Sequence, residues 1–447
     1  MNEFPSGAVC GDAAQKPVTL PERVPFSATP RETAAAFAMY GLAYLYIEMY
    51  DRIYGVYATV LPRVLLCAFT LGFVALTEYL HRDTPRMAES WVWLGCVACL
   101  TASVALERGN AWDVGMPLWF LHIFAVWWAL SRSHTLLAGE SGRLLPLDAL
   151  DGFFLFPLKH FFLRARTAFF ALSRLRGGQT REKSEDDASP VWTLVVAAAA
   201  LGLLALSARL LMDADAGFAA LLDGFTALLR FDWDLHSLMD VLFKLFLSLP
   251  VGAYLYGLLG GTLREDRGAL RKRAADTDEM LEALRGVQEK VWIALLALFC
   301  ALYAVFFAVQ GRYLFGAFTR TLPDGFIVSE YARQGFFELC KVMAVNFALL
   351  WLATRSSKAA VRERPTLRAL CLALLAESLL LAVVAFSKLA LYIDCFGFTP
   401  RRLQSTWLVC VLAFGCGCAA WSLARGGKTF RVWMMFGAVT LSLLCLY

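Results

Sequence analysis

The stretch RALCLALLAESLLLAVVAFSKLALY, residues 368–392, decides the fold class of this chain. Only Arg368, Glu377 and Lys388 carry a charge in it. A helix of about 17 to 25 apolar residues crosses roughly 30 Å of hydrocarbon. Ten more stretches have this length and character: 34–50, 54–79, 90–106, 111–130, 191–212, 237–261, 291–310, 334–354, 403–424 and 430–446. The sequence therefore predicts an all-α polytopic transmembrane helix bundle of about 11 spans.

The overall composition excludes a water-soluble protein. Hydrophobic residues make up 59% of the chain, charged residues only 18%, and the mean hydropathy is +0.57. Too few polar residues remain to cover a surface that faces water. The net charge of +5 comes from short loops, where anionic inner-leaflet lipids are the ordinary partner. We therefore expect the lipid bilayer and its anionic inner-leaflet lipids as partners, and no nucleic acid.

The distribution of cations predicts the orientation. If the amino terminus is cytoplasmic, the cytoplasmic loops contain 29 Lys and Arg residues and the outer loops contain 8. Positive residues concentrate in cytoplasmic loops of membrane proteins. The sequence thus predicts a cytoplasmic amino terminus and an extracytoplasmic carboxy terminus.

Cysteine usage predicts neither a disulfide framework nor a metal centre. Nearly all of the 12 cysteines lie inside apolar spans, where they behave as small hydrophobic residues. No His or carboxylate cluster accompanies them, so neither a metal nor a cofactor is expected. The first thirty residues lack the apolar core of a cleavable signal, and we expect the first span to target the chain.

Charge and hydropathy divide the chain into four expected parts. These are a cytoplasmic polar tail at 1–33, a four-helix transmembrane part at 34–130, a cytoplasmic linker at 131–190 and a seven-helix transmembrane part at 191–447. Within the linker, 153–175 reads either as an amphipathic helix at the membrane interface or as a re-entrant helix packed on the spans. Small residues four apart, as at Gly257 and Gly261, predict close helix packing.

Ionisable and polar residues inside the spans are candidates for function because burying them in lipid is unfavourable. The strongest candidates lie in spans eight and nine: Glu338, Lys341, Asn346, Glu377 and Lys388. Three interpretations stay open: a structural polar core, a solute or proton pathway, and an active site. Most ionisable residues of the spans lie in their outer halves, which favours a polar cavity open to the outside. Residues near span ends can instead snorkel to the headgroups.

A second set of candidates lies in the loops predicted to face outward. The set consists of Glu330, Tyr331, Arg333, Asp394, Arg401 and Arg402. Helix amino termini favour a carboxylate or a bound anion, and arginines can donate two hydrogen bonds to a phosphate. The alternative is an ion-pair network that fixes the turns.

Three stretches carry a family resemblance. EYARQGFFEL at 330–339, QGRYLFG at 310–316 and LYIDCFGFTPRRL at 391–403 resemble motifs of a bacterial multi-pass membrane family, domain of unknown function 4173, which has a Tyr-Ala-Arg hallmark. The resemblance covers about 190–447, with a Phe on each side of Gly397 where the family pattern has Tyr and Leu. It implies a multi-pass protein of the bacterial cytoplasmic (inner) membrane and no mechanism.

These features predict a non-enzymatic membrane protein that binds, senses or passes a small or lipid-derived ligand through an outward-facing polar cluster. The alternative is a transferase-type membrane enzyme acting on a lipid-linked phosphate at the outer leaflet. Its acid would come from Asp51, Glu330 or Asp394, with arginines holding the phosphate. No Gly-rich nucleotide loop and no hydrolase motif occurs in the sequence.

Overall fold

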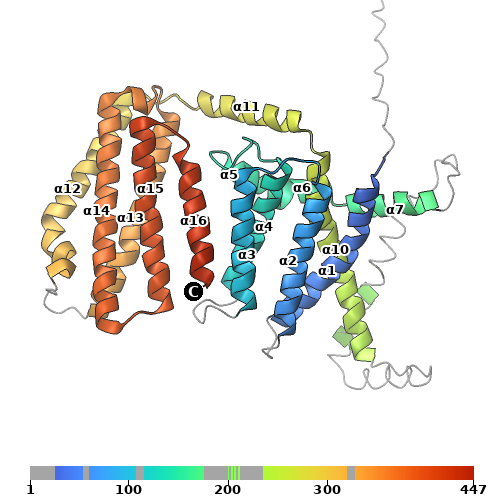
Figure 1. The fold of residues 1–447 in the computed structure, drawn as a ribbon. Helices are drawn as coiled ribbons and strands as arrows, with labels where there is room; N and C mark the ends of the chain where they lie inside the picture. The colour runs from blue at the N-terminus through green and yellow to red at the C-terminus, as the bar shows by residue number, and fades with distance from the viewer. Residues whose placement is uncertain are drawn as a thin grey trace, which may run out of the picture.

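The computed structural model describes residues 26–53, 60–106, 115–175, 235–319 and 328–446, with a few isolated positions between 200 and 211. Side chains in α10 are described from residue 237, in α12 up to 310 and in α13 from 336. Figure 1 shows the helices: α1 (Pro30–Ile53), α2 (Leu61–Leu80), α3 (Ala88–Ala105), α4 (Gly115–Ser133), α5 (Leu145–Leu150), the π-helix η1 (Asp151–Leu155), α6 (Phe156–Lys159), α7 (Leu163–Leu175), α10 (Leu235–Arg264), α11 (Arg267–Ala283), α12 (Glu289–Thr319), α13 (Val328–Ser356), the 3-10 helix η2 (Val361–Glu363), α14 (Pro365–Phe396), α15 (Pro400–Arg425) and α16 (Thr429–Leu446).

The all-α polytopic bundle predicted from hydropathy is confirmed. Eight of the described helices are long and apolar enough to cross a membrane, namely α2, α3, α10 and α12 to α16. Helices α1 and α4 also form at predicted spans. The predicted span at 191–212 lies outside the described residues, apart from a few isolated helical positions. Apolar runs become helices because lipid offers no partner for backbone N–H and C=O groups, so each must be satisfied within its own segment.

The long helices form two groups. The N-terminal group comprises α1 to α7 together with α10, which packs against α1 although about two hundred residues separate them. The C-terminal group comprises α12 to α15, with α14 packed against α12, α13 and α15. Helix α16 lies between the groups and contacts both α3 and α15. Helix α11 lies across the ends of the long helices and connects one group to the other (Figure 1).

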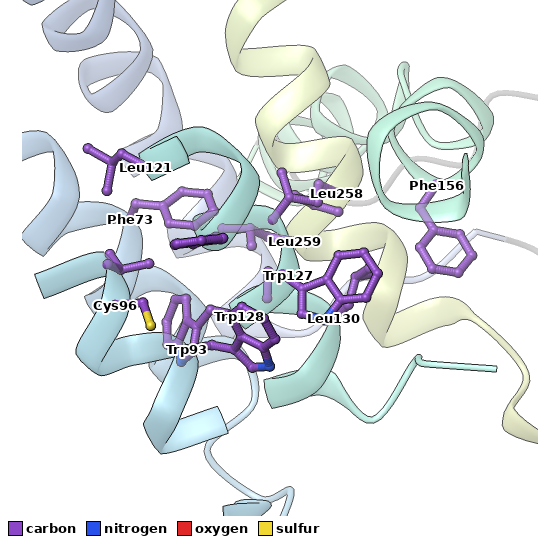
Figure 2. Packing of buried hydrophobic residues seen from close by; sticks show 14 of the residues in the cluster. Phe73, Trp93, Cys96, Leu121, Trp127, Trp128, Leu130, Phe156, Leu258 and Leu259 are labelled. Carbon is purple, nitrogen blue, oxygen red and sulfur yellow. The ribbon is translucent and has the colours of Figure 1, made fainter. Parts of the chain in front are cut away.

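Aromatic residues fill the core of the N-terminal group. Figure 2 shows Phe73, Trp93, Trp127 and Trp128 in this core together with Leu258 of α10. The rings of Trp93 and Trp127 lie 6.1 Å apart, and those of Phe73 and Trp128 lie 6.3 Å apart. Offset and edge contacts between aromatic rings stabilise such a core beyond simple burial.

The small residues of α10 allow a very close helix contact. A Cβ atom added at Gly257 would come within 2.5 Å of the Pro157 carbonyl oxygen, and one at Gly261 would lie 2.6 Å from the His160 ring. The predicted close packing at this pair is confirmed, with α6 as the partner. Helix α6 packs on α10, and η1 packs on α4. Helix α7 contacts α1 and α10, with Phe169 exposed.

Buried charges fix the connections at the α11 end. The Arg132 side chain is only 2% exposed and donates to Glu78 Oε1 at 2.9 Å, to the His81 carbonyl at 2.8 Å and to the Thr84 carbonyl at 3.1 Å. Arg273 of α11 donates to both carboxylate oxygens of buried Asp151, at 2.7 and 2.8 Å. These interactions tie the loops and α11 to the bundle because each buried charge needs a partner.

Candidate functional site

The predicted outer cluster is described only in part. Glu330, Tyr331 and Arg333 belong to the first turns of α13, but their side chains lie outside the described part of the structure. Asp394 and Arg401 are exposed at the α14–α15 turn. The cluster as a ligand site therefore stays a prediction.

Arg402 has a local structural role. Its guanidinium donates to the Gly397 carbonyl and lies 4.1 Å from the centre of the Tyr392 ring. Gly397 has a φ of 78°, which L side chains rarely adopt, so glycine suits this turn. These contacts hold the connection between α14 and α15.

Among the membrane-embedded candidates, Asn346 forms a hydrogen-bonded bridge. Its Oδ1 accepts from the Tyr303 hydroxyl at 2.6 Å, and its Nδ2 donates to Ser378 Oγ at 2.9 Å. The bridge joins α12, α13 and α14 in the interior. Sequence reasoning missed Tyr303 and Ser378, because hydroxyl groups in apolar spans carry no positional signal. Every described polar atom of the Asn346 amide has a protein partner, as expected for a structural polar core.

The remaining embedded candidates separate into different environments. Glu377 lies partly buried beside the Cys300 thiol, and Lys388 is fully buried on α14 with an electrostatic attraction to Glu338. Glu338 and Lys341 are exposed on α13, and no ion pair joins them in the described part of the structure. Glu377 also interacts electrostatically with Tyr303, the partner of Asn346, so the structure places Asn346 near Glu377 and couples Lys388 to Glu338, but it does not gather all five residues into one site.

An acidic cage surrounds Lys244, at the end of α10 that the cation distribution predicts to face outward. Its Nζ lies 3.0 Å from Glu48, 2.8 Å from Asp51 and 2.9 Å from Asp240. The cage joins α1 to α10. It pairs Lys244 with Asp51, one of the acids expected for an outer-leaflet enzyme. A single ammonium with three carboxylate partners is best explained as a fixed interhelical contact.

A cavity lies between the two helix groups, and we call it the inter-group pocket. Its volume is about 770 Å³, and it is bounded by the loop at 138–143, α13, α15 and α16. Its walls include Phe347, Trp351, Trp433 and small residues such as Gly415 and Ala419. This volume and mainly apolar lining fall within the range seen in small-molecule sites of other proteins.

Charged residues gather at one end of the inter-group pocket. Glu140 accepts from Arg431 at 2.6 Å and from Lys428. Hydrogen bonding to Lys428 holds the pKa of Glu140 below its usual range, so its carboxylate is ionised at neutral pH. Arg431 also lies 3.0 Å from Glu89, whose side chain is fully buried and accepts from Trp93 Nε1 at 3.0 Å.

The pocket combines an apolar slot with a charged end. An amphiphile has the matching parts, an apolar chain and a polar head. The charged end belongs to the loops at 131–190 and 425–431, which the cation distribution assigns to the cytoplasm. The site thus lies at the end opposite the predicted outer cluster. Sequence analysis did not single out Glu140 or Lys428, because nothing local indicates that these loops meet.

No curated protein and no solved structure matches the chain at a significant level. One family model does match, that of a domain of unknown function, DUF4153, over residues 94–447. The match begins well before residue 190, where the resemblance seen in the sequence starts, and it contains every residue that lines the inter-group pocket. The sequence thus pointed correctly to a family without an assigned function, while the link to domain 4173 and its Tyr-Ala-Arg motif stays a prediction. The chain belongs to the DUF4153 family.

Proposed function

We propose that this protein is a non-enzymatic membrane protein of the bacterial inner membrane that binds a lipid-derived amphiphile in the inter-group pocket. The observation that carries the proposal is the pocket itself: about 770 Å³ of space with aromatic walls and a charged end. An acyl chain fits the apolar slot, and a polar headgroup fits beside Lys428 and Arg431.

The position of α16 supports this function. Helix α16 forms part of the pocket wall and packs against α3 on one side and α15 on the other. A molecule bound there contacts elements of both helix groups. Binding therefore favours the arrangement of the two groups that closes around the ligand, which is how a sensor or a passage for the ligand would work.

The enzyme alternative has less support. Asp51 is engaged by Lys244, and Arg402 holds the Gly397 turn, so two groups available to an outer-leaflet transferase have structural partners. The outer cluster around Glu330 remains a proposal for a second ligand site.

The proposal is tested by identifying the lipids that purify with the protein. The protein is extracted into polymer nanodiscs, and bound amphiphiles are quantified by mass spectrometry. Ala419→Trp places an indole in the inter-group pocket, whereas Ala376→Trp changes an exposed residue on the surface of α14. We expect a defined amphiphile in the parent and in Ala376→Trp, and its loss in Ala419→Trp while that variant still unfolds in a cooperative thermal transition. Equal recovery from both variants would contradict the proposal.

A further inference from the structure

A second pocket lies between α11 and the loop at 134–144, and we call it the α11 pocket. Its volume is about 450 Å³. The floor is apolar, with Leu136, Leu137, Leu144 and Leu270 all buried. The rim is cationic. The pocket opens at the end of the bundle that the cation distribution assigns to the cytoplasm.

Three arginines line this pocket with a single carboxylate. Arg267 and Arg271 come from α11, while Arg143 comes from the facing loop. Asp278 forms an ion pair with Arg143. The lining residues thus carry an excess of two positive charges when His134 is neutral. Like charges four residues apart on a helix repel, so Arg267 and Arg271 destabilise α11 unless an anion offsets them.

The surroundings add to the positive potential. Arg355 of α13 is electrostatically coupled to Arg143, to Arg285 and to Asp278. Cations from α11, from the loop after it, from α13 and from the 134–144 loop therefore converge on this region. A positive field of this kind raises the local concentration of anions.

The loop that presents Arg143 is held in place. His134 has a φ of 61°, and its Nε2 donates to the Pro85 carbonyl at 2.6 Å. Arg267 approaches the Ser133 carbonyl at 3.4 Å, and the Leu137 amide donates to Asp148 Oδ1 at 2.8 Å. A fixed loop opposite α11 presents its arginine without a large ordering penalty on binding.

We propose that the α11 pocket binds a phosphate-type anion through Arg143, Arg267 and Arg271. Planar guanidinium groups match the oxygens of a phosphate with paired, charge-assisted hydrogen bonds. The phosphate belongs either to a lipid headgroup at the membrane surface or to a soluble cytoplasmic molecule. The site does not depend on the inter-group pocket being occupied, although Arg143 lines both pockets.

The test compares two sources of phosphate. The full chain is placed in nanodiscs of phosphatidylcholine, and its thermal unfolding is followed as inorganic phosphate is added at constant ionic strength with chloride. In a second arm, phosphatidylglycerol replaces part of the phosphatidylcholine. We expect a rise in Tm in at least one arm. A response to phosphate assigns a soluble ligand, and a response to phosphatidylglycerol alone assigns a headgroup.

Charge-neutralising variants distinguish binding at this site from a general attraction of anions to a positively charged protein surface. Arg271→Gln and Arg267→Gln should each weaken the apparent affinity about tenfold or more, the effect of losing a hydrogen bond to a charged group. Arg271→Gln should be at least as stable as the parent without the anion, because repulsion on α11 is relieved, whereas Arg267→Gln also loses its contact with the Ser133 carbonyl. Lys272→Gln is the matched control, since Lys272 is exposed on the same helix and does not line the pocket. Stabilisation by neither source, or equal responses from Arg271→Gln and Lys272→Gln, would overturn the proposal.

Discussion

Replacing Arg132 by Met should be among the most destabilising single changes in the N-terminal helix group. The guanidinium is 2% exposed and makes three hydrogen bonds, one to Glu78 and two to carbonyls of the α2–α3 connection. Methionine preserves much of the side-chain volume and removes all three donors. The change therefore isolates the polar interactions from packing.

The magnitude follows from burial. A hydrogen bond to a charged group contributes about 1.5 to 3 kcal/mol, so three would sum to roughly 4.5 to 9 kcal/mol. That sum is too large here, because Glu78 keeps Arg86 as a partner at 2.9 Å. We expect a loss of about 3 to 5 kcal/mol in the free energy of unfolding, as for other buried charges that lose one partner.

Arg86 supplies the matched control, since it pairs with the same carboxylate but its side chain is 46% exposed. Arg86→Met should lower the free energy of unfolding by only about 0.2 to 1 kcal/mol. Arg132→Lys keeps the charge without the forked geometry and should fall between the two. Equilibrium unfolding in mixed micelles measures all three. Equal losses for Arg132→Met and Arg86→Met would refute the argument from burial.

Three further predictions concern a buried acid, a helix contact and the orientation. Burial raises the pKa of Asp148 to about 7. Between about pH 4 and 7 the folded state holds a proton that the unfolded state has released, so the free energy of unfolding should fall as the pH rises through this range. Asp148→Asn should remove this pH dependence, as measured by thermal unfolding at several pH values. Gly257→Ala should lower the free energy of unfolding by about 1 to 3 kcal/mol, because its Cβ meets the α6 backbone. Gly95→Ala is the control: a Cβ there has nothing within 4 Å, so the change should raise the free energy of unfolding by up to about 1 kcal/mol. A stabilised Gly257→Ala protein would disprove the close contact. A membrane-impermeant thiol reagent on intact cells should label Asp324→Cys and spare Asp186→Cys in an otherwise cysteine-free chain, and the reverse pattern would invert the orientation.

Local sequence was sufficient to predict most of the helices. Ten of the eleven apolar runs coincide with long helices, and the eleventh lies outside the described residues apart from isolated positions. The prediction works because a long apolar run in lipid has one way to satisfy its backbone, and that requirement is met within each segment. The small-residue pair at Gly257 and Gly261 also predicted a close helix contact, but it did not predict that α6 is the partner.

The candidate site was far less predictable. Sequence reasoning selected charged residues inside spans, yet the structure spreads the five embedded candidates over different surroundings and uses Asn346 as an interhelical bridge. Arg143 lines both pockets, yet the sequence analysis did not single it out. Arg143 lies beside both pockets because the loop at 134–144 packs between α11 and the inter-group pocket.

The sequence by itself determined that this chain is an all-α membrane protein and where most of its helices lie, because both follow from local hydropathy; which side its positive charges face stays a prediction. Only the tertiary structure decided that α10 pairs with α1, that α16 lies between the two groups and that loop charges from distant segments surround two pockets. Lipid is as apolar as the helix surfaces, so helices choose neighbours by the fit of side chains and a few polar contacts. That fit depends on residues hundreds of positions apart, and no local period in the sequence records it.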